Sequence, residues 1–261
     1  MNYKIIACDL DDTLLDDFGK ISQKNKESIE KLPIYGIKFL LVTGRTYKSV
    51  LPFYNELHLN TPIITSGGTQ VFDSSGNMIF HDLLPKEKVK ALLKYSVENG
   101  IHAQVYMGED FQYLKSCEEA DYYASYTKLK GVEDPDLLEK DIETSKVVFI
   151  TDEQKAPEQI ERIKNIFPEL SVMRSKGRLI EVYTRHASKG NALKHIVEKM
   201  GFFKDEVVAV GDSTIDLSML EYAALSAAPE SSLLEVKEKV DVVLKDNNSS
   251  CVHELIERYF L

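Results

Sequence analysis

The sequence contains no long apolar run, few cysteines and no basic cluster, and each of these absences excludes a class of protein. No stretch of the 261 residues approaches the length of a membrane-spanning helix, and the first residues lack the apolar segment of a secretory signal peptide. We therefore expect a cytoplasmic protein with no membrane partner. The formal net charge of -10 includes no basic block, which argues against a nucleic-acid partner, and nothing indicates an obligate protein partner.

The three cysteines are far apart and odd in number, so they form neither a disulfide framework nor a zinc-binding spacing. Cys8 lies within an apolar run, where we expect it to be a small buried residue. The six histidines are scattered, and no glycine-rich dinucleotide fingerprint or P-loop follows a predicted strand. Zinc, redox and dinucleotide chemistry are therefore left without support.

The two ends of the chain share a pattern that the middle third lacks. In residues 1–82 and again in 187–261, short apolar runs alternate with amphipathic helical segments, the pattern of a parallel sheet with crossover helices. Residues 83–186 combine helices with short strands that we expect to pair antiparallel. The predicted fold class is α/β: a Rossmann-like doubly wound parallel-sheet core, discontinuous in sequence, with an inserted α+β domain.

Local signals place individual elements within this scheme. Ser22 and Ser188 are expected N-caps of amphipathic helices. Pro52 is expected to shorten or kink the helix that begins after Thr46. Residues 62–65 read as a third strand, and the turn-forming residues 73–77 indicate a β-hairpin.

Three carboxylates, Asp9, Asp11 and Asp12, follow the first predicted strand within four residues. Like charges at a strand end repel each other and lose hydration, so a metal ion, a lysine or both are expected beside them. Read alone, the cluster is equally consistent with a solvated acidic turn, because Asp-rich turns are common. In either case Asp12 and Thr13 are expected to shape the turn.

Polar residues also end the later apolar runs. Thr43 follows the second predicted strand, Ser66 the third and Asp212 a later one, while Lys189 opens a helix. Ligands of open parallel sheets bind beyond the carboxyl ends of the strands, so these positions favour a binding site over a solvated turn. The residue types suit phosphoryl transfer, because aspartate can attack phosphorus, Mg²⁺ prefers hard oxygen ligands, and lysine and threonine can hold phosphoryl oxygens.

Four segments resemble, in order, the four motifs of haloacid dehalogenase-like phosphatases. They are Asp9–Leu14 (DLDDTL), Leu41–Arg45 (LVTGR), Ser188–Leu193 (SKGNAL) and Gly211–Leu220 (GDSTIDLSML). The large insertion resembles the C2B cap of the Cof-type branch, which mostly hydrolyses sugar phosphates and related metabolites. The resemblance covers nearly the whole chain. It implies a Mg²⁺-dependent phosphatase acting on a small phosphorylated metabolite, with residues 83–186 as the cap that determines substrate specificity.

The resemblance also implies roles for single residues. Asp9 would be the nucleophile, forming an aspartyl-phosphate, and Asp11 would be the general acid and base. Lys189 would bridge Asp9 and the phosphoryl oxygens. The implied magnesium ligands are Asp9, Asp212 and the backbone carbonyl of Asp11, supported by Ser213 and Asp216. The implied phosphate- or substrate-binding residues are Leu10, Thr43, Gly44, Arg45, Ser66 and Lys189.

Two of these residues have alternative interpretations from the sequence alone. Arg45 is either a phosphate contact or a surface charge at a helix start, and Ser66 either contacts phosphate or satisfies the backbone.

One position departs from the fourth motif. Relatives usually carry asparagine before the final aspartate, and here the residue is Ile215. Isoleucine cannot donate a hydrogen bond, and a lost donor to developing charge can cost about 10²–10³-fold in rate. We expect catalysis to survive, weakened or with narrowed substrates. The alternatives are a phosphomutase, which returns the phosphoryl group to a sugar, and a catalytically weakened protein that binds a phosphorylated metabolite.

Overall fold

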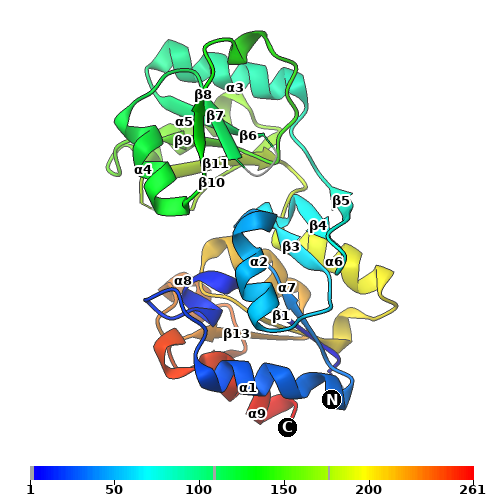
Figure 1. Ribbon diagram of the computed structural model, residues 1–261. Coiled ribbons are helices and arrows are strands. Elements are labelled where there is room, and N and C mark those ends of the chain that lie inside the picture. The colour runs from blue at the N-terminus through cyan, green and yellow to red at the C-terminus, as the bar shows by residue number, and fades with distance from the viewer. Residues whose placement is uncertain (1–2, 108–109, 176) are drawn as a thin grey trace. The chain divides into compact units, whose positions relative to one another are not determined.

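The computed structural model describes residues 3–107, 110–175 and 177–261, and it divides into two compact units (Figure 1). One unit comprises Met1–Phe80 and Ser188–Leu261, and the other comprises His81–Ala187. Within the residues that the structure describes, no helix combines the length and the apolar character that a membrane span requires.

A five-stranded parallel sheet forms the centre of the first unit, in the order β14-β13-β12-β1-β2. The N-terminal strand β1 therefore pairs on one side with β2 and on the other with β12, which the chain reaches only after the second unit. The predicted α/β class with a parallel, discontinuous core is confirmed. The strands are β1 (Ile5–Cys8), β2 (Lys38–Leu41), β12 (Val207–Val210), β13 (Leu225–Pro229) and β14 (Val242–Leu244).

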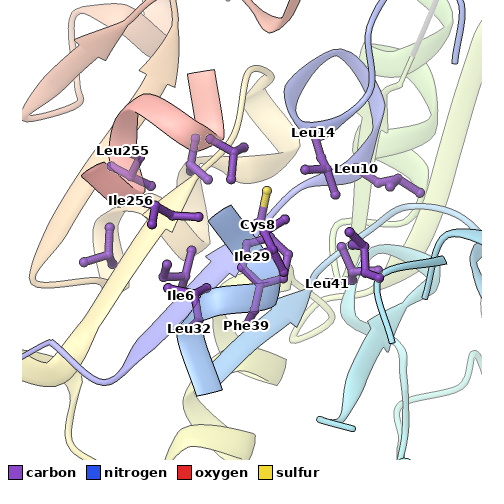
Figure 2. Packing of buried hydrophobic residues seen from close by; sticks show 14 of the residues in the cluster. Ile6, Cys8, Leu10, Leu14, Ile29, Leu32, Phe39, Leu41, Leu255 and Ile256 are labelled. Atoms are coloured by element: carbon purple, nitrogen blue, oxygen red, sulfur yellow. The ribbon is translucent and has the colours of Figure 1, made fainter. Parts of the chain in front are cut away.

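Helices cover both faces of this sheet, because successive strand residues point to opposite sides. On one face, Ile6 and Cys8 of β1 pack with apolar residues of α1, α2 and α9, as Figure 2 shows for α1 and α9. On the other face, Ile5 and Ala7 pack with α6, α7 and α8. Burial on both faces explains the continuous apolar run of β1. The helices are α1 (Gln23–Lys31), α2 (Tyr47–Glu56), α6 (Lys189–Lys199), α7 (Leu217–Tyr222), α8 (Leu234–Lys237) and α9 (Cys251–Tyr259).

The third predicted strand joins this sheet only at its edge. β3 (Ile63–Thr65) makes one parallel bridge, between Val42 and Ile64, and otherwise belongs to a three-stranded sheet with β4 (Gln70–Phe72) and β5 (Met78–His81). The predicted turn between β4 and β5 is present. Pro52 does not end α2, which continues to Glu56.

The second unit contains a six-stranded sheet in the order β10-β11-β9-β6-β7-β8. The helices α3 and α5 pack on one face and α4 on the other. Pairing is antiparallel as predicted, except that β7 and β8 are parallel. The elements are α3 (Lys86–Asn99), β6 (His102–Met107), β7 (Asp110–Tyr113), α4 (Glu118–Thr127), β8 (Gly131–Glu133), β9 (Val147–Ile150), α5 (Ala156–Ile166), β10 (Leu170–Arg174) and β11 (Leu179–Thr184).

Candidate active site

The carboxyl ends of β1, β2 and β12 lie side by side in the parallel sheet. Cys8, the last residue of β1, is in register with Leu41 of β2 and with Val210 of β12. Asp9 follows Cys8 directly, and Asp212 comes two residues after Val210. Parallel pairing therefore brings polar residues from distant parts of the sequence to one edge of the sheet.

Lys189 lies between two buried carboxylates. Its Nζ donates a hydrogen bond to Asp9 Oδ1 at 2.5 Å and another to Asp216 Oδ1, and none of the three side chains is more than 7% exposed. Burial by itself would lower the pKa of Lys189, but the charges of Asp216 and Asp9 outweigh it, and the pKa is raised. Lys189 therefore carries a positive charge at physiological pH.

Two glycines allow the start of α6 to bring Lys189 into this position. A Cβ on Gly68, whose φ is +97°, would lie 2.2 Å from the backbone oxygen of Ser188. A Cβ on Gly190 would lie 2.2 Å from the backbone oxygen of Ser218. Ser188 is the predicted N-cap, and its side chain accepts a hydrogen bond from the backbone of Asn191. The start of α6 is thus packed directly against Gly68, in the turn after β3, and against the backbone of α7 at Ser218.

Three carboxylates form a cluster around this lysine. Asp9, Asp212 and Asp216 each place an oxygen within 4.8 Å of the others. Burial, followed by the charge of Asp216, raises the pKa of Asp9 well above its usual range and that of Asp212 to about 7. Lys189 supplies one positive charge against three carboxylates, so a second cation would be stabilised here. Carboxylate oxygens are the hard ligands that Mg²⁺ prefers, and the donor set fits that ion.

Asp216 organises the turn that carries Asp212. Its Oδ2 accepts hydrogen bonds from Ser213 N at 2.9 Å, Ser213 Oγ at 2.8 Å and the backbone nitrogen of Asp212 at 3.2 Å. Because Oδ1 is bonded to Lys189, both oxygens of Asp216 are engaged. A Cβ on Gly211 would lie 2.6 Å from Asp216 Cβ, so glycine permits this close approach.

Thr13 contributes a contact that sequence reasoning did not predict. Its hydroxyl donates a hydrogen bond to Asp212 Oδ1 at 3.0 Å, across 199 residues of sequence. The sequence assigns Thr13 only to the turn after β1, and its place within the acidic motif is the one signal that could have identified it. The contact lowers the pKa of Asp212 and so acts against the effect of burial.

Asp11 and Arg45 form an ion pair at the edge of the cluster. Arg45 Nε donates to Asp11 Oδ2 at 2.9 Å, and Nη2 donates to Asp11 Oδ1 at 2.6 Å. The two side chains are 33% and 49% exposed. The guanidinium carbon also lies 5.1 Å from the ring centroid of Phe53. The sequence-based alternatives for Arg45 were a phosphate contact or a surface charge, and neither predicts Asp11 as its partner.

The remaining predicted binding residues differ in their burial and in the hydrogen bonds that they make. Thr43 is fully buried, and its hydroxyl accepts a hydrogen bond from the backbone nitrogen of Arg45 at 3.1 Å. Ser66 Oγ donates to Oε1 of Gln70, at the start of β4, in line with the alternative in which Ser66 serves the local structure. The side chain of Leu10 is buried in the core (Figure 2), so only its backbone could reach a phosphate.

The chain matches known proteins over almost its full length. The family model of haloacid dehalogenase-like hydrolases matches residues 6–256. Two Bacillus subtilis relatives, the 5-amino-6-(5-phospho-D-ribitylamino)uracil phosphatases YwtE and YcsE, are each 28% identical to it. The alignments cover 98% of this chain and 97% of YwtE, and 100% of this chain and 97% of YcsE.

A solved structure also has the same fold along almost the whole chain. The crystal structure of a haloacid dehalogenase-like hydrolase from Bacteroides thetaiotaomicron is 27% identical to this chain and has a TM-score of 0.88. The match covers 99% of this chain and 100% of that chain. The protein belongs to the haloacid dehalogenase-like hydrolases, as its four motifs indicate.

Proposed function

We propose that the protein is a Mg²⁺-dependent phosphatase that hydrolyses a small phosphorylated metabolite, such as a sugar phosphate, through a phosphoryl group held covalently on Asp9. The observation that carries the proposal is the buried Asp9 carboxylate with the Lys189 ammonium 2.5 Å from Oδ1. A fixed cation orients this carboxylate beside further acidic residues, an arrangement that suits attack on a phosphate monoester. The same buried ion pair would contribute little to the stability of the fold, so a purely structural role explains it poorly.

Asp9 acts as the nucleophile in this proposal. Lys189 binds Oδ1 and fixes the orientation of the carboxylate, which leaves Oδ2 to form the bond to phosphorus. Asp216 in turn fixes Lys189 through Oδ1 and fixes the turn of Asp212 through Oδ2. When bound by Asp9, Asp212 and the backbone carbonyl of Asp11, Mg²⁺ would offset the charge that gathers around the phosphoryl group.

Asp11 moves the protons. It gives a proton to the leaving alkoxide as the bond between phosphorus and that oxygen breaks, and it later takes a proton from the water that attacks the Asp9 phosphoryl group. Free Asp9, inorganic phosphate and an alcohol are the products. Thr43 and Gly44 hold the phosphoryl group through the hydroxyl and the backbone, and the Lys189 ammonium faces oxygens that become more negative during transfer.

The relatives and the second unit support this choice of substrate class. YwtE and YcsE are named as phosphatases of a phosphorylated ribitylamino compound, which supports a small phosphomonoester as the substrate. In the proposal, His81–Ala187 is the cap that selects the leaving group, and the enzyme works in the cytoplasm. Alternatives that remain for the test are a phosphomutase and a protein that binds a phosphorylated metabolite without turnover, the latter favoured by Ile215.

Phosphate release from p-nitrophenyl phosphate and a panel of sugar phosphates tests the proposal. Release should require Mg²⁺, stop with EDTA and be abolished in Asp9→Asn. Asp12→Asn is the matched control, because it removes the same charge three residues away and should retain turnover. Thermal stabilisation by a metabolite without turnover would support the binding protein instead, and phosphoryl migration with little free phosphate would indicate the mutase.

A further inference from the structure

The ion pair between Asp11 and Arg45 is at odds with the proposed role of Asp11. Both carboxylate oxygens accept hydrogen bonds from one guanidinium, at 2.6 and 2.9 Å. A carboxylate held in this way is oriented by the guanidinium, which competes with a leaving group for both oxygens. If Asp11 transfers protons, this ion pair must open before the reaction.

The backbone of Arg45 is fixed, so any change must involve its side chain. Its nitrogen donates to Thr43 Oγ1 at 3.1 Å, and its carbonyl accepts from Ser66 N at 2.8 Å. Both partners follow neighbouring strands and were predicted to bind phosphate. Phe53 of α2 lies beneath the guanidinium, with 5.1 Å from Cζ to the ring centroid, and provides a surface on which the group can shift.

A phosphoryl group is a strong competitor for this guanidinium. The parallel N–H donors of arginine fit two phosphate oxygens as well as they fit two carboxylate oxygens, and a phosphate monoester carries up to two negative charges. The pair is also weak, because side chains that are 33% and 49% exposed remain solvated and screened. An anion that binds beside Thr43 can therefore take Arg45 from Asp11 at small cost.

We propose that Arg45 exchanges partners during binding: it holds the Asp11 carboxylate in the free enzyme and transfers its two hydrogen bonds to the phosphoryl oxygens of the substrate. Asp11 is thereby freed for proton transfer only when a phosphate group is bound, that is, when a leaving group is present to receive the proton. Arg45 is a positioning residue for Asp11 and a ligand of the phosphoryl group in turn. This inference rests on the proposed function, which supplies the role of Asp11.

Binding of inorganic phosphate by calorimetry, with Mg²⁺ present, tests the exchange without turnover. Asp11→Asn removes the competing charge and releases Arg45, so phosphate should bind about two- to five-fold more tightly, the equivalent of a lost exposed ion pair. In an Arg45→Met background, the same Asp11→Asn change should have little effect. Asp12→Asn is the matched control for removal of a nearby charge and should tighten binding less than Asp11→Asn does.

Steady-state kinetics on p-nitrophenyl phosphate provide a readout that does not depend on the Asp11 variants. Arg45→Met loses the phosphoryl contact while leaving Asp11 released, so KM should rise by about ten-fold with a much smaller change in kcat. The KM of Arg45→Lys should lie between those of the wild-type enzyme and Arg45→Met, since lysine binds phosphate as a point charge.

Equal tightening by Asp11→Asn in both backgrounds, or none in either, would overturn the exchange, as would a fall in kcat of Arg45→Met with KM unchanged. Failure of the proposed function would look different. The wild-type enzyme would then release no phosphate. The calorimetric comparison of phosphate binding by the Asp11→Asn variants would still show whether Arg45 exchanges partners.

Discussion

Lys189 Nζ lies 2.5 Å from Asp9 Oδ1, although 180 residues separate the two in the sequence. This bond joins the first strand of the parallel sheet to the helix that follows the second unit. It also places the positively charged ammonium of Lys189 beside the carboxylate that is proposed to attack phosphorus.

Lys189→Met should destabilise the protein strongly in the absence of metal. The change leaves Asp9 and Asp216 buried without their cation, and breaking a buried pair in this way typically costs about 3–5 kcal/mol of the free energy of unfolding. Urea unfolding at neutral pH measures the loss. Added Mg²⁺ should restore part of it, because the ion binds the same carboxylates.

The control is Lys194→Met, an exposed position on the same helix. It should change the free energy of unfolding by no more than about 0.5 kcal/mol. A Lys189→Met protein as stable as this control in EDTA would show that Lys189 is not needed to balance the carboxylates.

Metal-free stability should fall as the pH rises towards 7, because of Asp212. The pKa of Asp212 is about 7 in the folded protein, against about 3.9 in an unfolded chain. The folded state therefore binds the proton more tightly, and this contribution to stability is present below about pH 4 and lost between there and pH 7. Urea unfolding in EDTA from pH 4.5 to 8 measures it, and Asp212→Asn should flatten that part of the profile.

The same protonation should weaken Mg²⁺ binding at low pH. Metal binding requires the ionised carboxylate, so the apparent affinity should fall by up to about ten-fold per pH unit below 7 and level off above it. Calorimetric titrations in two buffers of different ionisation enthalpy would report the proton released. An affinity that does not vary between pH 5.5 and 7.5 would contradict the raised pKa of Asp212.

Ile215→Asn should raise activity. Ile215 immediately precedes Asp216 in the turn that carries Asp212, at the position where the motif resemblance leads one to expect asparagine. Restoring a donor should increase kcat/KM by roughly ten-fold, a fraction of the 10²–10³-fold that a lost donor can cost. Ile215→Leu controls for loss of packing and should give no gain. If Ile215→Asn leaves kcat/KM unchanged on every substrate, the isoleucine does not weaken the site.

The second unit has a buried charge pair of its own, which predicts how its core responds to mutation. Lys146 Nζ donates to Glu181 Oε1 at 2.8 Å, and Tyr183 donates to the other oxygen of Glu181. Lys146→Met should lower the free energy of unfolding by about 3 kcal/mol, since Glu181 is left without its cation, and Lys146→Met with Glu181→Gln should recover much of this. Identical losses in the single and double variants would show that the pair is not coupled.

Much of the core fold could be predicted from the sequence, because buried parallel strands leave a strong signal. Residues 5–8, 39–41 and 207–210 are uninterrupted apolar runs, each followed within two residues by polar residues at the same edge of the sheet. The strand β8 left no such signal: it has three residues, begins with Gly131 and is only partly buried. Its parallel pairing with β7 depends on tertiary contacts that no local pattern encodes.

Part of the candidate site could be predicted from the sequence as well. The requirement for a cation near Asp9 follows from crowded carboxylates, and Lys189 meets it. The hydrogen bond from Thr13 to Asp212 and the pairing of Arg45 with Asp11 could not be anticipated. Both depend on side-chain geometry between segments that are distant in sequence, and each residue also has an ordinary local role at a turn or a helix start.

Direct detection of a phosphoryl group on Asp9 tests the central claim. Wild-type enzyme should be acid-quenched during turnover of a good substrate with Mg²⁺, digested, and searched by mass spectrometry for a phosphorylated peptide containing Asp9. The account predicts an acyl-phosphate on Asp9 in the wild-type enzyme and none in Asp9→Asn. Turnover without any covalent phosphate, or a phosphoryl group on another residue, would contradict it.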